Sequence, residues 1–436
     1  MSTFVAALAA LTLAQSPLAA PLALAQAPAA APLTLGEALQ RAAQANTDLR
    51  AAQAKLAQAK AGIWKGWSYH LPQVTAGATW THNRDEAIIQ FGGVDIVLQK
   101  QDQLAGQVEV KQALFAPQAW FGIQAAYKGA DVAAKSAEGA RREVLFGVAQ
   151  AYYGVTSLKK LVKVSEELQG IAARQERDAK VRLDAGTIAK VGHLRAQIDL
   201  SRADQDLVRA RNAYQSSMIA LATLLDRDTD FEVVEPPEPA LPTDTSVLAD
   251  EALKARPDLQ AARLNEDLAV TLRRVSAARY LPSLGAFYRW QIANVSGFTG
   301  KSDSWAAGLG LSWSLFDGGL REGELREGSA KIAEAEATRR GLENRVTAEV
   351  RQALLDLDSA RANAVKAREQ ARLAQENQRL VDVSFRAGAA TAVEQADATA
   401  ALRNAAIAAT SDELLVNLSA VRLLKVAGVF EPVPRR

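Results

Sequence analysis

Few side chains of this 436-residue chain have a spacing suited to catalysis or metal binding. Cysteine is absent, which excludes a disulfide framework, a thiolate metal site and a cysteine nucleophile. The three histidines, His70, His82 and His193, lack the spacing of metal ligands. No nucleophile elbow or phosphate-binding loop occurs, and Gly308-Leu309-Gly310 lacks a third glycine. The sequence therefore predicts a protein that is not an enzyme and has no cofactor and no metal site.

One acidic pair has a spacing that could matter for ions. Glu394 and Asp397 are three residues apart, so a helix would carry both carboxylates on one face. Paired carboxylates attract cations and repel one another when they are brought close. Taken alone, such a pair is more often a solvated helix surface than a site. Both interpretations stay open from the residues themselves.

Composition and the N-terminus restrict the class of protein. The formal net charge of +2 does not support nucleic-acid binding, which needs a basic surface. Residues 4–24 are uncharged and apolar or small, and Ala23-Leu24-Ala25 offers a cleavage site, so residues 1–25 are expected to be a signal peptide. A disordered leader rich in Ala and Pro is the alternative. No later apolar run reaches 18 residues, so membrane contact requires a β-barrel or a surface contact.

The chain consists of two similar halves. Residues 46–52 resemble residues 256–262 at an offset of about 210, and Ala185-Gly186 resembles Ala387-Gly388 at an offset of about 202. A proline-rich linker at 235–246 separates the halves. We therefore expect a first repeat at 26–234, a second at 247–428 and a C-terminal tail at 429–436.

Each half contains a long helical pattern. Between Pro117 and Pro236 and between Pro282 and Pro432 there is no proline, and helix-favouring residues dominate. Val346, Val350, Leu354 and Leu357 form a helical stripe. A helix over 118–182 would be about 100 Å long. Such helices need partners along their length, as in coiled coils. The long helices are expected to extend to about 225 and about 427.

Each half also contains two alternating segments, expected as strands at about 73–84, 103–115, 283–295 and 304–316. Their length and period match outer-membrane strands, although a soluble sheet packed on a core is the alternative. The tryptophans cluster at these segments, which predicts an interfacial girdle of Trp80, Trp290, Trp305 and Trp313. On the polar face, Glu109, Lys111 and Arg289 would face a lumen, or would merely aid solubility. Four strands cannot enclose a lumen, so several chains must share one barrel.

Two glycines mark the breaks between the long helices. Gly186 and Gly388 follow helical segments, where glycine tolerates the left-handed conformation of a helix stop. Thr187 and Ala389 come next in the sequence. Thr187 is also expected to cap the following helix.

Several motifs together carry a resemblance to a known family. They are Leu71-Pro72 and Leu281-Pro282 at the passage from helix to strand, Leu315-Phe316-Asp317-Gly318-Gly319 at the passage from strand to helix, and the breaks at 182–187 and 385–389. With the two halves, they make residues 33–428 resemble the outer-membrane efflux protein family of TolC-like channels.

The resemblance implies a mixed fold, a membrane β-barrel joined to a long α-helical coiled-coil barrel. A homotrimer would build a twelve-stranded barrel in the cell outer membrane, in contact with its lipid, with the helical part in the periplasm. It implies an exit duct for a tripartite efflux or type I secretion system, working with a periplasmic adaptor and an inner-membrane pump.

The resemblance also implies roles for residues. The adaptor would dock at the tips Gly186, Thr187, Gly388 and Ala389, and Glu394 and Asp397 would line the periplasmic aperture. The rival interpretation from the residues is a non-membrane coiled-coil scaffold or adaptor of the periplasm. That rival explains the helices but not the alternating strands.

Overall fold

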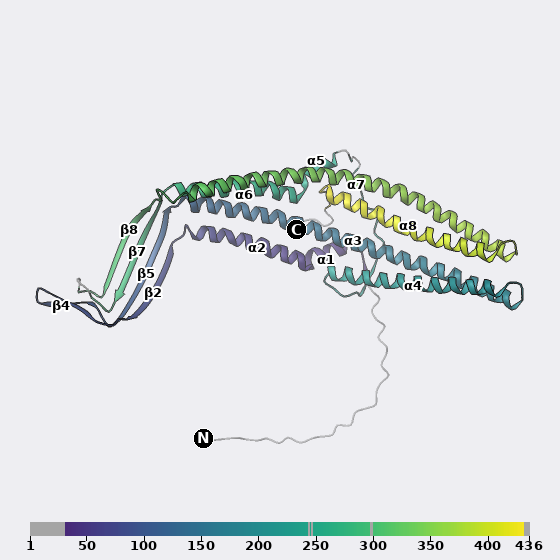
Figure 1. Ribbon diagram of the computed structural model, residues 1–436, viewed down its shortest axis with the longest axis horizontal. Helices are drawn as coiled ribbons and strands as arrows, with labels where there is room; N and C mark the ends of the chain where they lie inside the picture. The colour runs from purple at the N-terminus through teal and green to yellow at the C-terminus, as the bar shows by residue number, and fades with distance from the viewer. Residues whose placement is uncertain (1–30, 243–244, 246, 297–299, 431–436) are drawn as a thin grey trace, which may run out of the picture.

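The computed structural model describes residues 31–242, 245, 247–296 and 300–430. The expected signal peptide at 1–25 and residues 431–436 of the expected tail lie outside this range. The molecule is elongated, with a sheet at one end and helices that extend from it to two tips at the other end (Figure 1).

The order of elements repeats along the chain, as the halves of the sequence predict. The first repeat contains β1 (Ala31–Leu33), α1 (Leu35–Ala45), α2 (Thr47–Ser68), β2 (Gln73–His82), β3 (Ala87–Phe91), β4 (Val94–Gln99), β5 (Asp102–Phe115), α3 (Pro117–Asp184), α4 (Lys190–Leu224) and β6 (Phe231–Val233). The second contains α5 (Leu248–Ala255), α6 (Pro257–Ala277), the 3-10 turn η1 (Ala278–Tyr280), β7 (Ser283–Ala293), β8 (Asp303–Ser312), α7 (Leu320–Arg386) and α8 (Ala392–Val426).

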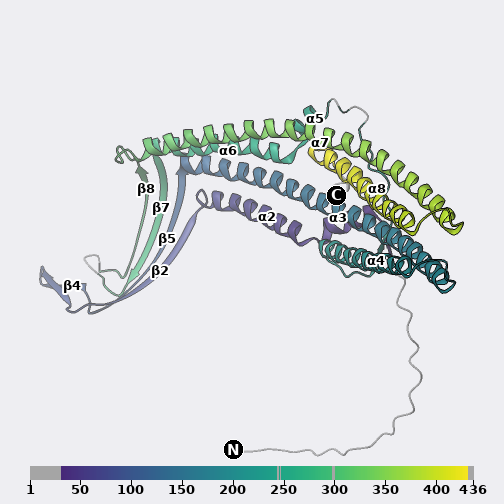
Figure 2. The same ribbon diagram turned by 45° about the vertical axis from the view of Figure 1, so that its right-hand side comes forward.

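The two long helices are α3, with 68 residues, and α7, with 67 residues. Each is therefore about 100 Å long. Near the sheet, α2, α3, α6 and α7 lie side by side, and toward the tips α4 pairs with α3 and α8 with α7 (Figures 1 and 2). Among the described residues, no helix is both long and apolar enough to cross a membrane.

The stripe expected on α7 is buried. Val346, Val350 and Leu357 pack against Leu248 of α5 and Leu423 of α8. Leu354 is partly buried beside them. The helical period therefore turns one face of α7 toward the other helices of its own repeat.

The main sheet has the strand order β2-β5-β7-β8, and all of its neighbours are antiparallel. β8 ends at Ser312, before the expected end at 316, because the carbonyls of Ser314 and Leu315 accept hydrogen bonds from Arg321 instead of a strand. In the described part of the chain, no strand lies on the outer edge of β2 or β8. Four strands per chain in this sheet agree with the sequence prediction.

The connection between β2 and β5 lies between the expected strands at 73–84 and 103–115, and it is not an open loop. It contains a second hairpin, in which β3 pairs with β4. Gly92 and Gly93 have φ of 61° and 83°. Two successive residues with positive φ form the tight turn that suits the twist of a hairpin, and glycine adopts them without strain.

Tyr152 joins the two ends of the first repeat. β1 and β6 pair in parallel, and the side chain of Tyr152 is fully buried beneath them. Its hydroxyl lies 2.6 Å from the carbonyl oxygens of both Leu33 and Val234 and accepts the Val234 N–H at 3.1 Å. Burial raises the pKa of Tyr152 to about 12, against the opposing effect of the Val234 hydrogen bond. Phe430, the last described residue, is also buried here, against Phe146.

We expect Tyr152→Phe to lower the free energy of unfolding by about 1–3 kcal/mol, because the carbonyl groups of Leu33 and Val234 lose a hydrogen bond to the buried hydroxyl. Urea unfolding followed by far-UV circular dichroism measures this. Tyr153→Phe is the control, since that hydroxyl makes a single bond, to the Pro237 carbonyl at 3.2 Å. An equal loss of unfolding free energy in the two variants would contradict the stabilising role of the Tyr152 hydroxyl.

Candidate functional site

The polar face of the sheet carries a charge cluster. Register places Glu109 of β5 directly opposite Arg289 of β7, and Lys111 lies two residues further on the same face. The carboxylate of Glu109 is 2.6 Å from Arg289 Nη2 and 2.8 Å from Lys111 Nζ, and it is buried between them. The structure thus brings together three residues that the sequence assigned to a lumen. Their position in a lumen stays a prediction.

The opposite face is apolar and largely exposed. It carries Trp80, Trp290 and Trp305, and the register pairs Trp290 with Trp305. The side chains of Trp80 and Trp305 are 65% and 68% exposed, whereas Trp290 is half-buried. Such exposure is unfavourable in water but suits contact with lipid.

Trp313 lies beyond the end of β8, at the helix side of the sheet, where its indole N–H donates to the Tyr280 carbonyl at 3.1 Å. The four tryptophans therefore lie at two levels of the sheet, as a girdle requires. The girdle itself stays a prediction.

The first tip is a helix stop built on Gly186. This glycine has φ of 70°, and the N–H of Thr187 donates to the Arg182 carbonyl at 2.9 Å. The Thr187 hydroxyl donates to the same carbonyl at 3.0 Å. Thr187 therefore completes the end of α3, and the expectation that it caps the next helix is wrong, because α4 begins only at Lys190 without a side-chain cap.

The second tip repeats this geometry and adds a true cap. Gly388 has φ of 77°, and the N–H of Ala389 donates to the Ser384 carbonyl at 2.8 Å. Thr391 and Glu394 form a capping box at the start of α8. The backbone N–H and hydroxyl of Thr391 donate to the Glu394 carboxylate at 2.7 and 2.9 Å.

Glu394 and Asp397 are both exposed near the start of α8, whereas Gln395 and Ala398 are buried. The predicted pair therefore points away from the rest of its own chain. The hydrogen bonds from Thr391 lower the pKa of Glu394, which keeps this carboxylate ionised. The lining of an aperture stays a prediction.

Arg182 joins the two tips, a role that the sequence did not predict. Its guanidinium donates to the carbonyl oxygens of Phe385 and Arg386 at 3.0 and 2.9 Å and lies 4.7 Å from the Phe385 ring centroid. Deeper in the same region, Gln175 of α3 donates to Thr399 of α8 at 3.0 Å. The tip regions of the two repeats are therefore directly bonded.

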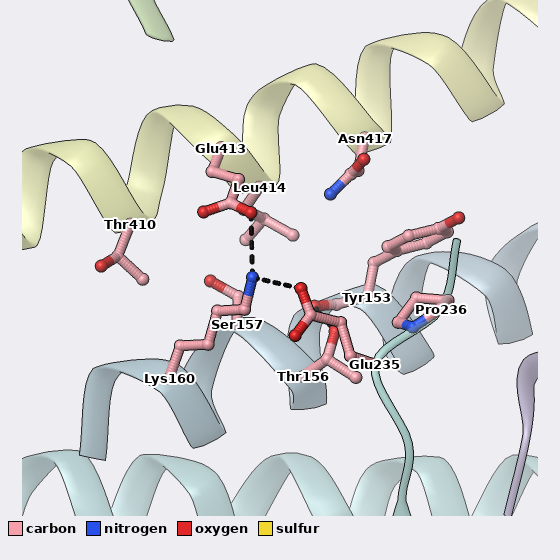
Figure 3. A pocket seen from close by; sticks show the side chains of 10 residues that line it. All are labelled: Tyr153, Thr156, Ser157, Lys160, Glu235, Pro236, Thr410, Glu413, Leu414 and Asn417. Carbon is pink, nitrogen blue, oxygen red and sulfur yellow. Dashed lines mark hydrogen bonds and ion pairs between the residues drawn. The ribbon is translucent and has the colours of Figure 1, made fainter. Parts of the chain in front are cut away.

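A further connection between the repeats lies at Lys160, and Figure 3 shows its ion pairs. Lys160 Nζ of α3 is 2.6 Å from Glu235, at the start of the linker, and 2.9 Å from Glu413 of α8. Burial lowers the pKa of Lys160, but its hydrogen bonds to both carboxylates outweigh this and raise it. The pocket around it has a volume of about 20 Å³, which is room for roughly one water molecule. Lys160 therefore connects α3 of the first repeat to α8 of the second.

Among residues 31–242, 245, 247–296 and 300–430, no group of three His, Asp or Glu side chains is arranged to hold a metal ion.

The model of a family described as "Outer membrane efflux protein" matches residues 38–227 and 248–429, which correspond to the two repeats. The chain is 30% identical over 250 residues to Protein CyaE of Bordetella pertussis, a match that spans 55% of this chain and 52% of that relative. It is 24% identical to Outer membrane protein TolC of Escherichia coli over 84% of this chain and 76% of that protein.

Solved structures show the same fold. The CmeC outer membrane channel of Campylobacter jejuni superposes with a TM-score of 0.78 at 18% identity, covering 92% of this chain and 87% of that one. VceC of Vibrio cholerae superposes with a TM-score of 0.75 at 18% identity, covering 90% of this chain and 96% of that one.

We expect Arg182→Met to weaken the contact between the tips by about 1–3 kcal/mol, since two charged hydrogen bonds are lost. The tips should separate more often, and the mean single-channel conductance in a planar bilayer should rise roughly twofold. Arg177→Met is the control, because Arg177 is exposed on the same helix. A conductance equal to that of the parent would contradict a role of Arg182 in holding the tips.

We expect Glu109→Gln to make the channel more anion-selective, because Arg289 and Lys111 lose their counter-charge. The permeability ratio of chloride to potassium, from the reversal potential in a salt gradient, should rise roughly twofold. The double variant Glu109→Gln/Arg289→Gln keeps the net charge of the parent cluster and should restore its selectivity. Unchanged selectivity in the single variant would place the cluster outside the ion path.

Proposed function

This chain belongs to the outer membrane efflux protein family, and we propose that three copies of it form the exit duct of a tripartite efflux or type I secretion system. The duct is located in the cell outer membrane, with its helices in the periplasm. It conducts exported substrates passively, while an inner-membrane pump supplies the energy. On this proposal the protein is not an enzyme, since no bond is made or broken in the duct.

The observation that carries this proposal is the open sheet. One face is apolar and exposed, the other is polar, and the edges at β2 and β8 lack a partner in the described chain. In lipid such edges must be paired, which copies of the chain achieve when β8 of one pairs with β2 of the next. Three copies give twelve strands and a barrel of about 12 Å radius at the usual strand spacing and tilt.

The helices support the same assembly. Leu373 and Leu380 on α7 are exposed and seven residues apart, and so are Val191 and Ile198 on α4. Exposed apolar residues at heptad spacing indicate a coiled-coil contact that a single chain leaves open. Neighbouring copies in a helical barrel would cover these stripes.

The tips suit docking of a periplasmic adaptor. Gly186, Thr187, Gly388 and Ala389 are exposed and lie at the end farthest from the sheet (Figures 1 and 2). An adaptor bound there would couple the pump to the duct. TolC and CyaE are among the relatives of this chain, and the tip geometry is compatible with either class of export system.

The aperture is proposed at Glu394 and Asp397. Three copies of this exposed pair would form rings of carboxylates close to the tips, which favour cations over anions in a pore. The contact between tips through Arg182 lies beside them. A scaffold without a channel would share the helices but would neither insert into a bilayer nor conduct.

We expect the purified oligomer to conduct ions in a planar bilayer, and Glu394→Gln/Asp397→Asn to lower its preference for potassium over chloride by roughly twofold. Glutamine keeps the capping box with Thr391, so the start of α8 is retained. Glu167→Gln, at an exposed position on α3, is the control. Parent-like conductance and selectivity would contradict the aperture assignment. A folded oligomer that never conducts would favour the scaffold.

A further inference from the structure

The β3–β4 hairpin is an apolar element at the end of the barrel sheet. Within residues 87–99, Asp95 is the one charged residue, whereas Arg84, Asp85, Glu86, Lys100 and Asp102 surround its base. Ile88, Ile89 and Leu98 are 51%, 41% and 40% exposed. An isolated two-stranded hairpin is marginally stable in water, and exposed apolar strands attract other strands. The hairpin therefore needs a partner that a single chain does not provide.

The position of the hairpin argues against the acyl chains of lipid as that partner. It extends beyond the main sheet, on the side away from the helices (Figures 1 and 2). At its base, His82 Nδ1 lies 2.9 Å from Asp102, and the backbone N–H of Asn83 donates to the Gln101 carbonyl at 2.7 Å. This charged and polar base separates the hairpin from the apolar face that ends at Trp80. The hairpin therefore projects into water.

The hairpin is long enough to contact the same hairpin in other copies of the chain. The nine residues from 83 to 91 span about 30 Å when extended. A twelve-stranded barrel has a radius of about 12 Å. Each hairpin can therefore reach the axis of the barrel, where three would meet. The second repeat has no such element, since the described residues between β7 and β8 contain no strand.

We propose that the three hairpins of one trimer associate with one another over the outer mouth of the barrel, through Ile88, Ile89 and Leu98. This proposal rests on the proposed trimer. The association buries apolar side chains that would otherwise face water, and it extends the contact between copies beyond the β2 edge. It narrows the mouth of the barrel at the end opposite the tips.

The absence of cysteine in the chain allows a direct test. We expect Ile89→Cys, treated with an oxidant in the assembled trimer, to give disulfide-linked dimers on a denaturing gel, because one disulfide joins two chains. Oxidation should lower the conductance, and reduction should restore it. Thr81→Cys is the control. At the wall of the barrel its copies are about 21 Å apart, too far for a disulfide, which needs Cα atoms within about 7 Å.

A native gel shows whether the trimer is present, and it therefore distinguishes failure of the hairpin proposal from failure of the proposed function. Loss of the trimer in the parent protein would overturn the proposed function, while an intact trimer of Ile89→Cys that forms no cross-link would overturn the hairpin proposal alone. Labelling with a water-soluble maleimide in lipid vesicles adds a further readout. If the cysteine at position 89 is neither labelled nor cross-linked, the hairpin lies in lipid, and the hairpin proposal is overturned. If Ile89→Cys does not assemble, Leu98→Cys on the other strand provides the same readout.

Discussion

The unpaired backbone groups along the edges of β2 and β8 are the constraint on which the rest of this structure depends. Lipid offers no hydrogen-bond partner, so a four-stranded sheet is stable in a membrane only when copies close it into a barrel. Closure then separates the two faces. In the proposed barrel, Trp80 and Trp305 would face outward to lipid, and Glu109 and Arg289 would face the interior. The helices continue from the strands and must therefore form a ring of their own.

The helices need cross-connections because each is long and contacts other helices along a narrow stripe. Several polar contacts in the described chain bond one repeat to the other, and two of them lie at different distances from the tips. Lys160 holds α8 and the start of the linker midway along α3, and Arg182 bonds the ends of α3 and α7. Separation of the tips must break the Arg182 contacts but can leave those of Lys160 in place. The duct can therefore change at its periplasmic end while its middle stays joined.

Several features were predictable because they depend on residues close in sequence. The helical stripe at Val346 and Val350, the alternation in the strands and the stops at Gly186 and Gly388 all follow from local geometry. One local feature was missed and one was misjudged. Residues 83–102 contain a hairpin, which Gly92-Gly93 between apolar runs could have indicated. The cap belongs to Thr391, which has Glu394 three residues later, and not to Thr187, which lacks such a partner.

By itself, the sequence determined the two repeats, the types and approximate lengths of the elements and the polarity of each strand face, because these depend on spacings of two to four residues. Only the tertiary structure decided which distant residues meet. Arg182 reaches Phe385, Lys160 reaches Glu413, and Glu109 lies opposite Arg289. Each pair joins one repeat to the other, so it depends on how the repeats lie side by side, and no local periodicity encodes that register.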